Sequence, residues 1–228
     1  MWLEVERFQT SESIRLGIVL AMAGGFMDAY SYIGRGGVFA NAETGNIVLL
    51  AVSLGDGQFG MALHYLAPII AFATGVLLSE WVKRTKKGSL SLFHWRQIVL
   101  MYEMLSMIMV AFLPQEWNFL ANSLISLACG IQVTTFAKIH GHGMATTMCT
   151  GNLRTGTQSL NKYFQTKDAR HYKDAVFYYG CIAWFVIGAM IGNFYTRQWQ
   201  EMAILVVVGL LGVAYVMMFF NKEANKDM

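Results

Sequence analysis

Six apolar stretches, each close to the length that a bilayer-spanning helix needs, run through almost the whole chain. A spanning helix takes about 20 mainly apolar residues, and these stretches are residues 14–33, 61–82, 98–113, 119–138, 175–195 and 202–220. Only 14% of the residues are charged, against about 25% in soluble domains, and the mean hydropathy is +0.42. We therefore predict an all-α integral membrane protein with a single membrane domain over residues 1–228.

An internal repeat relates the two halves of the chain. A shift of 106 residues places residues 24–55 on residues 130–161 without a gap, and eight of the 32 aligned positions are identical. Both copies contain the tripeptide Thr-Gly-Asn, at residues 44–46 and 150–152. Self-similarity of this kind indicates a duplicated structural unit. We predict two repeat units.

The repeat units are residues 13–113 and 117–221, and their alignment continues beyond the tripeptides. With seven residues inserted after the second tripeptide, Phe72 falls on Phe185, and Gly75 and Ser79 fall on Gly188 and Gly192. Small residues four apart favour close helix packing. The Gly75 and Gly188 faces are therefore candidates either for contacts within the chain or for a homodimer.

The tripeptides lie in two segments, residues 38–54 and 144–160, that do not resemble full spans. In the first, only residues 47–54 are continuously apolar, and eight helical residues cover about 12 Å of a ~30 Å hydrocarbon core. The second contains Arg154 and several Thr and Gln residues. Such segments are tolerated at membrane depth only where protein or a wet cavity surrounds them. We predict two short re-entrant or broken helices.

The distribution of Lys and Arg favours this arrangement. With six spans and two hairpins, 14 of the 17 basic residues lie on the side of both termini, whereas eight spans divide them eight against eight. The positive-inside rule therefore favours six spans with cytoplasmic termini. Because three crossings per unit invert the second copy, the hairpins enter from opposite faces. The two tripeptides are then expected near the midplane.

Two such turns suit a central binding site. Thr and Asn can cap free N–H groups, and helix N-termini directed at the midplane favour negative charge. An anion or a polar neutral solute fits this chemistry. The candidate substrate-binding residues are Asn46, Asn152, Arg154, Thr44, Thr150 and Gln132. The alternative is that Asn46 and Asn152 only cap helices and bond each other.

Ionisable residues within the apolar segments are the second functional signal. An acid at membrane depth needs a partner or a wet cavity, and such acids often relay protons or bind cations. Asp28 and Glu43 are therefore candidates for coupling to H⁺ or Na⁺. Arg154 is interpreted either as a substrate-binding residue or as a structural partner of Asp28 or Glu43.

Other function classes lack a signal. The sequence has no phosphate-binding glycine loop, no metal-ligand cluster and no catalytic triad pattern, so we expect neither an enzyme nor a resident metal or cofactor. The net charge of +3 comes with basic residues placed between spans, which argues against nucleic-acid binding. Residues 1–12 are polar, so no cleaved signal peptide is expected. Cys129, Cys149 and Cys181 are expected to be free thiols.

The residues Gly24-Gly25-Phe26-Met27-Asp28-Ala29-Tyr30-Ser31-Tyr32 and Glu43-Thr44-Gly45-Asn46 resemble the YoaK family of small multi-pass bacterial membrane proteins. The second half supports the match through Met148-Cys149-Thr150-Gly151-Asn152-Leu153-Arg154. The resemblance covers most of the chain and implies an all-helical fold in the bacterial cytoplasmic membrane. It implies no substrate.

From the repeat and the buried polar residues we predict a transporter or channel for a small polar or anionic solute. The expected partners are membrane lipid and that solute. The alternative function is a non-transporting accessory or scaffold protein whose buried polar residues are structural.

Overall fold

The computed structural model describes residues 14–85, 92–139, 142–143 and 146–223. The long helices are α1 (Ile14–Gly34), α2 (Glu43–Gly55), α3 (Phe59–Thr85), α4 (Leu92–Ala111), α5 (Asn118–Thr135), α6 (Cys149–Thr166), α7 (Ala169–Trp199) and α8 (Leu205–Glu223). Two 3₁₀ helices, η2 (Gln115–Trp117) and η3 (Gln200–Ile204), precede α5 and α8. The polar segment 1–12 lies outside the described residues.

The prediction of a helical membrane protein is confirmed, with one small addition. Two antiparallel two-residue strands, β1 (Lys138–Ile139) and β2 (His142–Gly143), precede α6. Three helical stretches among the described residues are long and apolar enough to cross a bilayer: Ile14–Gly34, Phe59–Arg84 and Ala169–Met218. The last of these combines α7, η3 and most of α8. The helix α5 does not reach this hydropathy because its sequence includes Asn118, Asn122 and Gln132.

Each of the two atypical segments folds as an irregular stretch followed by a helix. α2 begins at Glu43 and α6 begins at Cys149, which are 106 residues apart and directly precede the two tripeptides. The first predicted segment begins at residue 38, where the chain is not yet helical. The start of the second predicted segment, residue 144, lies outside the described residues. Neither helix has a side-chain cap at its N-terminus, so the expected capping by Thr or Asn is wrong.

The stretch before α2 passes through the interior. Gly36 and Gly37 have φ of 84° and 76°, a conformation that favours glycine, and they turn the chain back along the bundle. Ala40 and Asn41 are then fully buried. The Ser126 hydroxyl of α5 donates to the Ala40 carbonyl at 3.0 Å. The bundle therefore holds this non-helical backbone and satisfies part of its hydrogen bonding, as membrane depth requires.

Close crossings of small residues join the two halves. α1 packs on α7, and α3 packs on α5. A Cβ added at Gly25 of α1 would meet the Phe185 carbonyl of α7, and one added at Gly130 of α5 would meet the Phe72 carbonyl of α3. The faces of Gly75 and Gly188 are likewise covered, by Leu127 and Met22. These faces pack within the chain, so they are not exposed for a homodimer.

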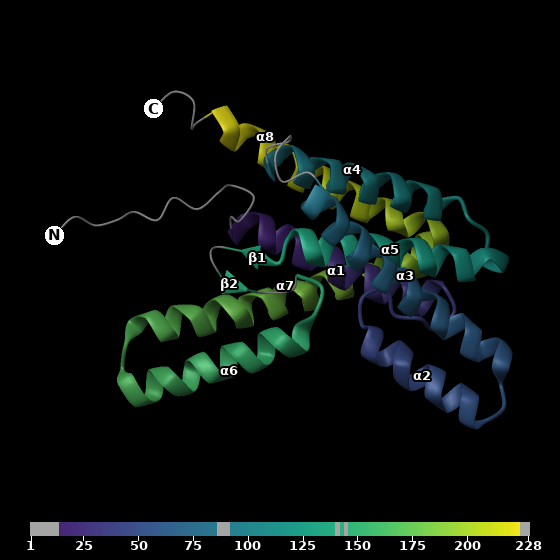
Figure 1. Cartoon of the computed structure of the whole chain (residues 1–228), viewed down its shortest axis with the longest axis horizontal. Helices are drawn as coiled ribbons and strands as arrows, with labels where there is room; N and C mark the ends of the chain where they lie inside the picture. Colours follow the sequence, from purple (N-terminus) through teal and green to yellow (C-terminus); the bar gives the residue numbers. More distant parts are fainter. Residues whose placement is uncertain (1–13, 86–91, 140–141, 144–145, 224–228) are drawn as a thin grey trace.

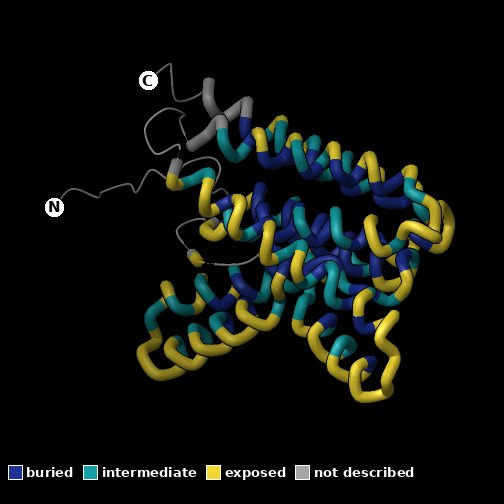
Figure 2. The backbone as a smooth tube through the Cα atoms, turned by 45° about the vertical axis from the view of Figure 1, so that its right-hand side comes forward, coloured by how far each residue is buried: buried dark blue, intermediate teal, exposed yellow. Residues whose placement is uncertain are grey.

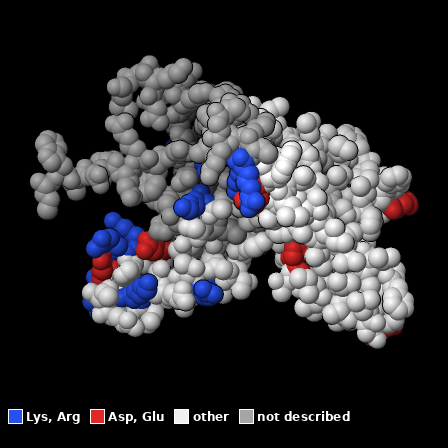
Figure 3. Space-filling model, viewed as in Figure 1, with Lys and Arg blue, Asp and Glu red and all other residues white. Residues whose placement is uncertain are grey.

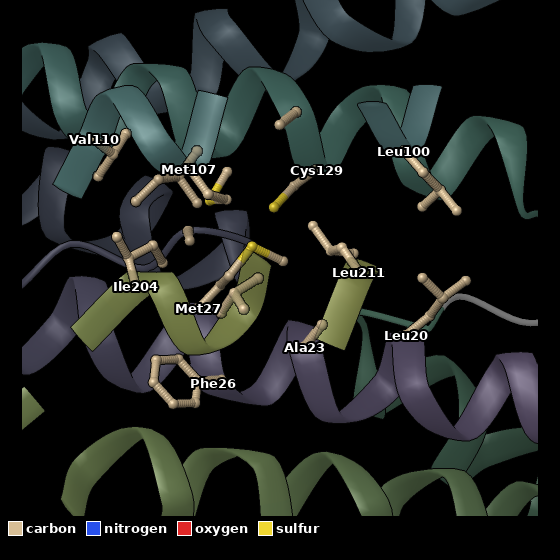
Figure 4. Packing of buried hydrophobic residues seen from close by; sticks show 14 of the residues in the cluster. Leu20, Ala23, Phe26, Met27, Leu100, Met107, Val110, Cys129, Ile204 and Leu211 are labelled. Carbon is tan, nitrogen blue, oxygen red and sulfur yellow. The ribbon is translucent and has the colours of Figure 1, made fainter. Parts of the chain in front are cut away.

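The apolar core lies between α1, α4, α5, α8 and η3. Figure 4 shows Leu20, Ala23 and Met27 of α1 facing Leu211 of α8, with Met107 and Leu100 of α4 beyond. The side chains named here are buried. Dispersion contacts among these closely packed side chains favour association of the helices.

Two helical pairs project from this core as arms (Figure 1). The first arm is α2 with the N-terminal part of α3, and the second arm is α6 with the N-terminal part of α7. Only Asn46 and Ser53 are buried in α2, and only Asn152 and Gly156 in α6. Figure 2 shows the exposure rising toward both arm ends. The arms begin at the body of the protein, where the two tripeptides lie.

Candidate functional site

A cavity of about 610 Å³ lies between the starts of the two arms. Thr44 lines it from the start of α2, and Thr150 and Gly151 line it from the start of α6. Its remaining walls come from α1, α7 and the irregular stretches before α2 and α6. Both tripeptides thus contribute to one cavity, which has a volume typical of small-molecule sites.

Asp28 is the acid of α1 at this cavity. Its side chain is 8% exposed, and Oδ1 accepts a hydrogen bond from the backbone N–H of Asn41 at 2.7 Å. The Asn41 side-chain amide in turn donates to the Gly24 carbonyl at 3.0 Å. These two bonds fix the irregular stretch against α1. They also place the Asp28 carboxyl and the Asn41 amide side by side at the cavity wall.

Glu43 opens α2 and also lines the cavity. Its Oε2 accepts a hydrogen bond from the Asn46 amide at 2.9 Å, whereas its Oε1 is buried with no hydrogen-bond partner. An acid in the first turn interacts favourably with the helix dipole. Asp28 and Glu43, the two acids that the sequence singled out, therefore line the same cavity.

Asn46 has a different role from the predicted one. Its Oδ1 accepts from the Phe39 N–H at 3.0 Å, and its Nδ2 donates to the Phe39 carbonyl at 2.8 Å as well as to Glu43. The side chain therefore braces the turn into α2 and does not line the cavity. It bonds Phe39 and Glu43 and not Asn152, so the expected pairing of the two Asn residues is wrong.

Asn152 and Arg154, unlike Thr44 and Thr150, also lie away from the cavity. Asn152 is buried, is not among the lining residues and has interactions of its own. Arg154 is exposed on α6 and forms no ion pair with Asp28 or Glu43, so that predicted pairing is wrong. Gly151 is the last residue of α6 that lines the cavity, and Arg154 lies beyond it.

Gln132 lies in the interior of α5. It is fully buried, both polar atoms of its side chain have no hydrogen-bond partner, and it does not line the cavity. The expectation that it forms the opposite wall is therefore wrong. That wall is formed by Thr147, Met148 and Cys149 before and at the start of α6, and by Phe185 and Ala189 of α7.

Sequence reasoning missed Asn41 and Thr147, which are buried polar residues of the two irregular stretches. Both line the cavity, and they are 106 residues apart, so the repeat aligns them with each other. That alignment was the available signal. The signal is weak because the two positions differ in residue type, Asn in one copy and Thr in the other.

Arg35 is a further residue that the sequence did not single out. It is fully buried, and it donates to the carbonyls of Val110 at 2.7 Å and Leu113 at 2.8 Å and to the Tyr30 hydroxyl at 2.8 Å. A cation at the end of α4 complements the carbonyls that a helix C-terminus leaves free. Arg35 thus ties the end of α1 to the end of α4.

The cavity lining is suited to some ligands and not to others. It contains two carboxyl groups, and no Lys or Arg is among its residues. Within the described part of the chain, no group of three or more His, Cys, Asp or Glu side chains is placed to hold a metal ion. The three cysteines are free, and Cys149 lines the cavity.

Comparison with known proteins agrees with the fold and the motifs. A family model described as "Protein of unknown function (DUF1275)" matches residues 16–217. The chain belongs to this family. This DUF1275 protein is also similar to the UPF0700 transmembrane protein YoaK of Bacillus subtilis (strain 168), with 27% identity over 186 aligned residues. The match covers 76% of this chain and 79% of the relative. No solved structure matches the DUF1275 chain.

The resemblance to the YoaK family, inferred from the motifs, is therefore confirmed. The match includes α1 through most of α8, and so both tripeptides and all the walls of the cavity. Together with the apolar helices, it identifies the DUF1275 chain as a membrane protein of helical fold.

Proposed function

We propose that this protein is a transporter or channel, with the cavity between the two arms as its solute site. The observation that carries the proposal is that the starts of α2 and α6 line one cavity. Discontinuous helices that meet at the centre of a repeated bundle are a recurrent way to build a transport site. Such irregular backbone at membrane depth is costly, and a solute path gives a reason for keeping it.

The proposed topology has six spans, α1, α3, α4, α5, α7 and α8, with α2 and α6 as short helices entering from opposite faces. The two arms support this through their charge. The second arm includes Lys162, Lys167 and Arg170, whereas the turn at the end of the first arm has Asp56 and neither Lys nor Arg. On the face in Figure 3, basic side chains gather over the second arm. In Figure 1 the tip of this arm lies on the side where α1 begins and α8 ends. Positive charge favours the cytoplasmic side, so we assign both termini and the second arm's tip to the cytoplasm of a bacterial cell.

The solute proposed here is small and either polar and neutral or cationic. Two carboxyl groups and the absence of Lys and Arg from the lining disfavour an anion, because like charges repel strongly where water is scarce. The aromatic and aliphatic lining, including Phe39, Ile33 and Phe185, suits a solute with an apolar part. Asp28 and Glu43 provide the acidic groups for coupling to a cation.

The test is a flux assay with a cavity-filling variant and a matched control on the same helix. Thr150→Phe places a ring in the cavity, whereas Leu153→Phe places one on an exposed position of α6 that does not line it. Purified protein in liposomes is assayed with a panel of small polar and cationic solutes, and gel filtration confirms that each variant is folded. We expect flux from the wild type and Leu153→Phe and none from Thr150→Phe. A folded wild-type protein that passes no solute, or equal flux from both variants, contradicts the proposal.

The alternative is an accessory or scaffold membrane protein, and one observation favours it. The hydrogen bonds of the Asn46 side chain go to Phe39 and Glu43, at the turn into α2, so at least part of the duplicated motif is structural. If the protein is a scaffold, neither the wild type nor the Thr150→Phe variant is expected to transport any solute. The same assay therefore separates the two functions.

A further inference from the structure

Three oxygen atoms at the cavity have no hydrogen-bond partner in the described part of the chain. They are Asn41 Oδ1, Glu43 Oε1 and Thr147 Oγ1, and all three residues line the cavity. Asn41 is 0% exposed and Thr147 is 2% exposed. Buried polar atoms are nearly always paired with protein, water or a ligand. The cavity wall therefore offers oxygen acceptors to whatever occupies it.

Two of these residues approach the same point of α1 from the two halves of the chain. Asn41 donates to the Gly24 carbonyl at 3.0 Å, and a Cβ added at Gly24 would lie 3.1 Å from Thr147 Cγ2. Gly24 thus lets Thr147 come close to the helix backbone beside Asn41. Asp28 follows one turn later on α1 and adds its carboxyl to this group.

The chemistry of this group is that of a hard cation site. All four side chains, Asp28, Asn41, Glu43 and Thr147, provide oxygen atoms, which small hard cations prefer over nitrogen and sulfur. A proton would need only one of the carboxyl groups and would leave the amide and hydroxyl oxygens unpaired. Several oxygens from three separate segments are better explained by an ion that all of them contact.

The charge balance at the cavity indicates a monovalent ion. The two carboxylates carry two negative charges, and each helix N-terminus that faces them contributes roughly half a positive charge. The sum is about one negative charge, which a single monovalent cation neutralises. A divalent cation would leave an excess positive charge in surroundings of low dielectric.

We propose that the cavity binds one sodium ion, with Asp28, Asn41 and Glu43 on one side and Thr147 on the other. The role of this ion in coupling rests on the proposed transport function, whereas its binding does not. The ion joins the irregular stretches of the two repeats, so its occupancy stabilises the contact of α1 with both of them.

The test measures sodium binding to the full-length protein without any solute. Thr147→Val removes the oxygen and keeps the shape, and Thr147→Ser keeps the oxygen. Thr146→Val is the matched control, because Thr146 is also buried with an unpaired hydroxyl but does not line the cavity. Purified protein in detergent is titrated with ²²Na⁺, and its thermal unfolding is compared in sodium, potassium and choline chloride of equal concentration at fixed pH.

We expect sodium alone to bind and to raise the unfolding temperature of the wild type. Thr146→Val and Thr147→Ser keep this response, whereas Thr147→Val loses at least about tenfold in affinity, the effect of one hydrogen bond or ligand to a charge. Asp28→Asn abolishes binding. Identical behaviour in the three salts, or undiminished sodium binding by Thr147→Val, overturns the proposal and leaves water or a proton as the occupant.

The outcome is separate from that of the flux assay. Sodium binding without solute flux would support the ion site and contradict the transport function. If the protein binds no sodium and its solute flux is the same in sodium and in choline, the result would support transport and contradict the ion site.

Discussion

Asn46 illustrates how a side chain in a repeated motif can be essential for structure and not for ligand contact. Its amide satisfies both backbone groups of Phe39 and one oxygen of Glu43. The backbone N–H and carbonyl of Phe39 lie in the irregular stretch before α2, where no helix or sheet provides their hydrogen-bond partners. Such groups are costly when left unpaired in a membrane protein.

We therefore predict that Asn46→Ala lowers the free energy of unfolding by about 2–4 kcal/mol, since three hydrogen bonds disappear and leave buried partners behind. Denaturant unfolding in detergent measures this change, and the yield of folded protein should fall with it. Asn161→Ala, at an exposed position of α6, is the control and should be neutral. An Asn46→Ala protein as stable as the control would show that the brace has no energetic importance.

Some residues of the cavity could be singled out from the sequence because their signal is local. Asp28 and Glu43 could be selected because an acid in an apolar segment needs a special environment wherever the chain folds. Arg35 could not, because its partners Val110 and Leu113 are more than 70 residues away in the sequence. The position of Arg154 outside the cavity could not be predicted either, because no sequence pattern specifies which residues of α6 line it.

At the scale of the elements, glycines decide how closely the helices of the two halves approach. Gly25 of α1 contacts the backbone of α7 at Phe185, and Gly188 of α7 contacts the backbone of α1 at Met22. In a bilayer, the hydrophobic effect does not drive helices together, because lipid tails are as apolar as the helix surfaces. Close backbone packing therefore contributes much of the association free energy. Gly209 of α8 has open space around it and makes no such contact.

Because of this difference, we predict that replacing glycine with alanine affects stability differently at Gly25 and at Gly209. Gly25→Ala should lower stability by about 1–3 kcal/mol, because its Cβ meets the α7 backbone and the helices must separate. Gly209→Ala should leave stability unchanged or raise it by about 0.5–1 kcal/mol, the usual gain from replacing glycine within a helix. Thermal unfolding of the two purified variants measures both. Equal destabilisation of the two would mean that the α1–α7 crossing does not depend on this contact.

The starts of α2 and α6 could be located from sequence to within a few residues because the duplicated tripeptide marks them. The sequence did not predict that the stretches before them are buried and non-helical. Residues 38–42 contain Val38 and Ala40, which fit a helix as well as a loop, and only the turn at Gly36 and Gly37 separates them from α1. Tertiary contacts such as that of Ser126 with Ala40 decide the outcome.

At the scale of the whole molecule, the proposed central site requires that the two arms have opposite orientations in the membrane. In that arrangement α2 and α6 both begin near the midplane, and the cavity between them is the centre of the protein. The pairings of α1 with α7 and of α3 with α5 are what a two-fold relation between the halves requires. The separation of the basic second arm from the acidic turn of the first supports the same arrangement.

The most direct test is the sidedness of the two arm tips. After Cys129, Cys149 and Cys181 are replaced with Ala, one new cysteine is introduced at Gln58, between α2 and α3, or at Ala169, where α7 begins. Intact cells are treated with a membrane-impermeant maleimide, before and after they are opened. We expect the cysteine at position 58 to react in intact cells and the cysteine at position 169 to react only in opened cells. Reaction of both from the same side would contradict the inverted arrangement and, with it, a central site between the two arms.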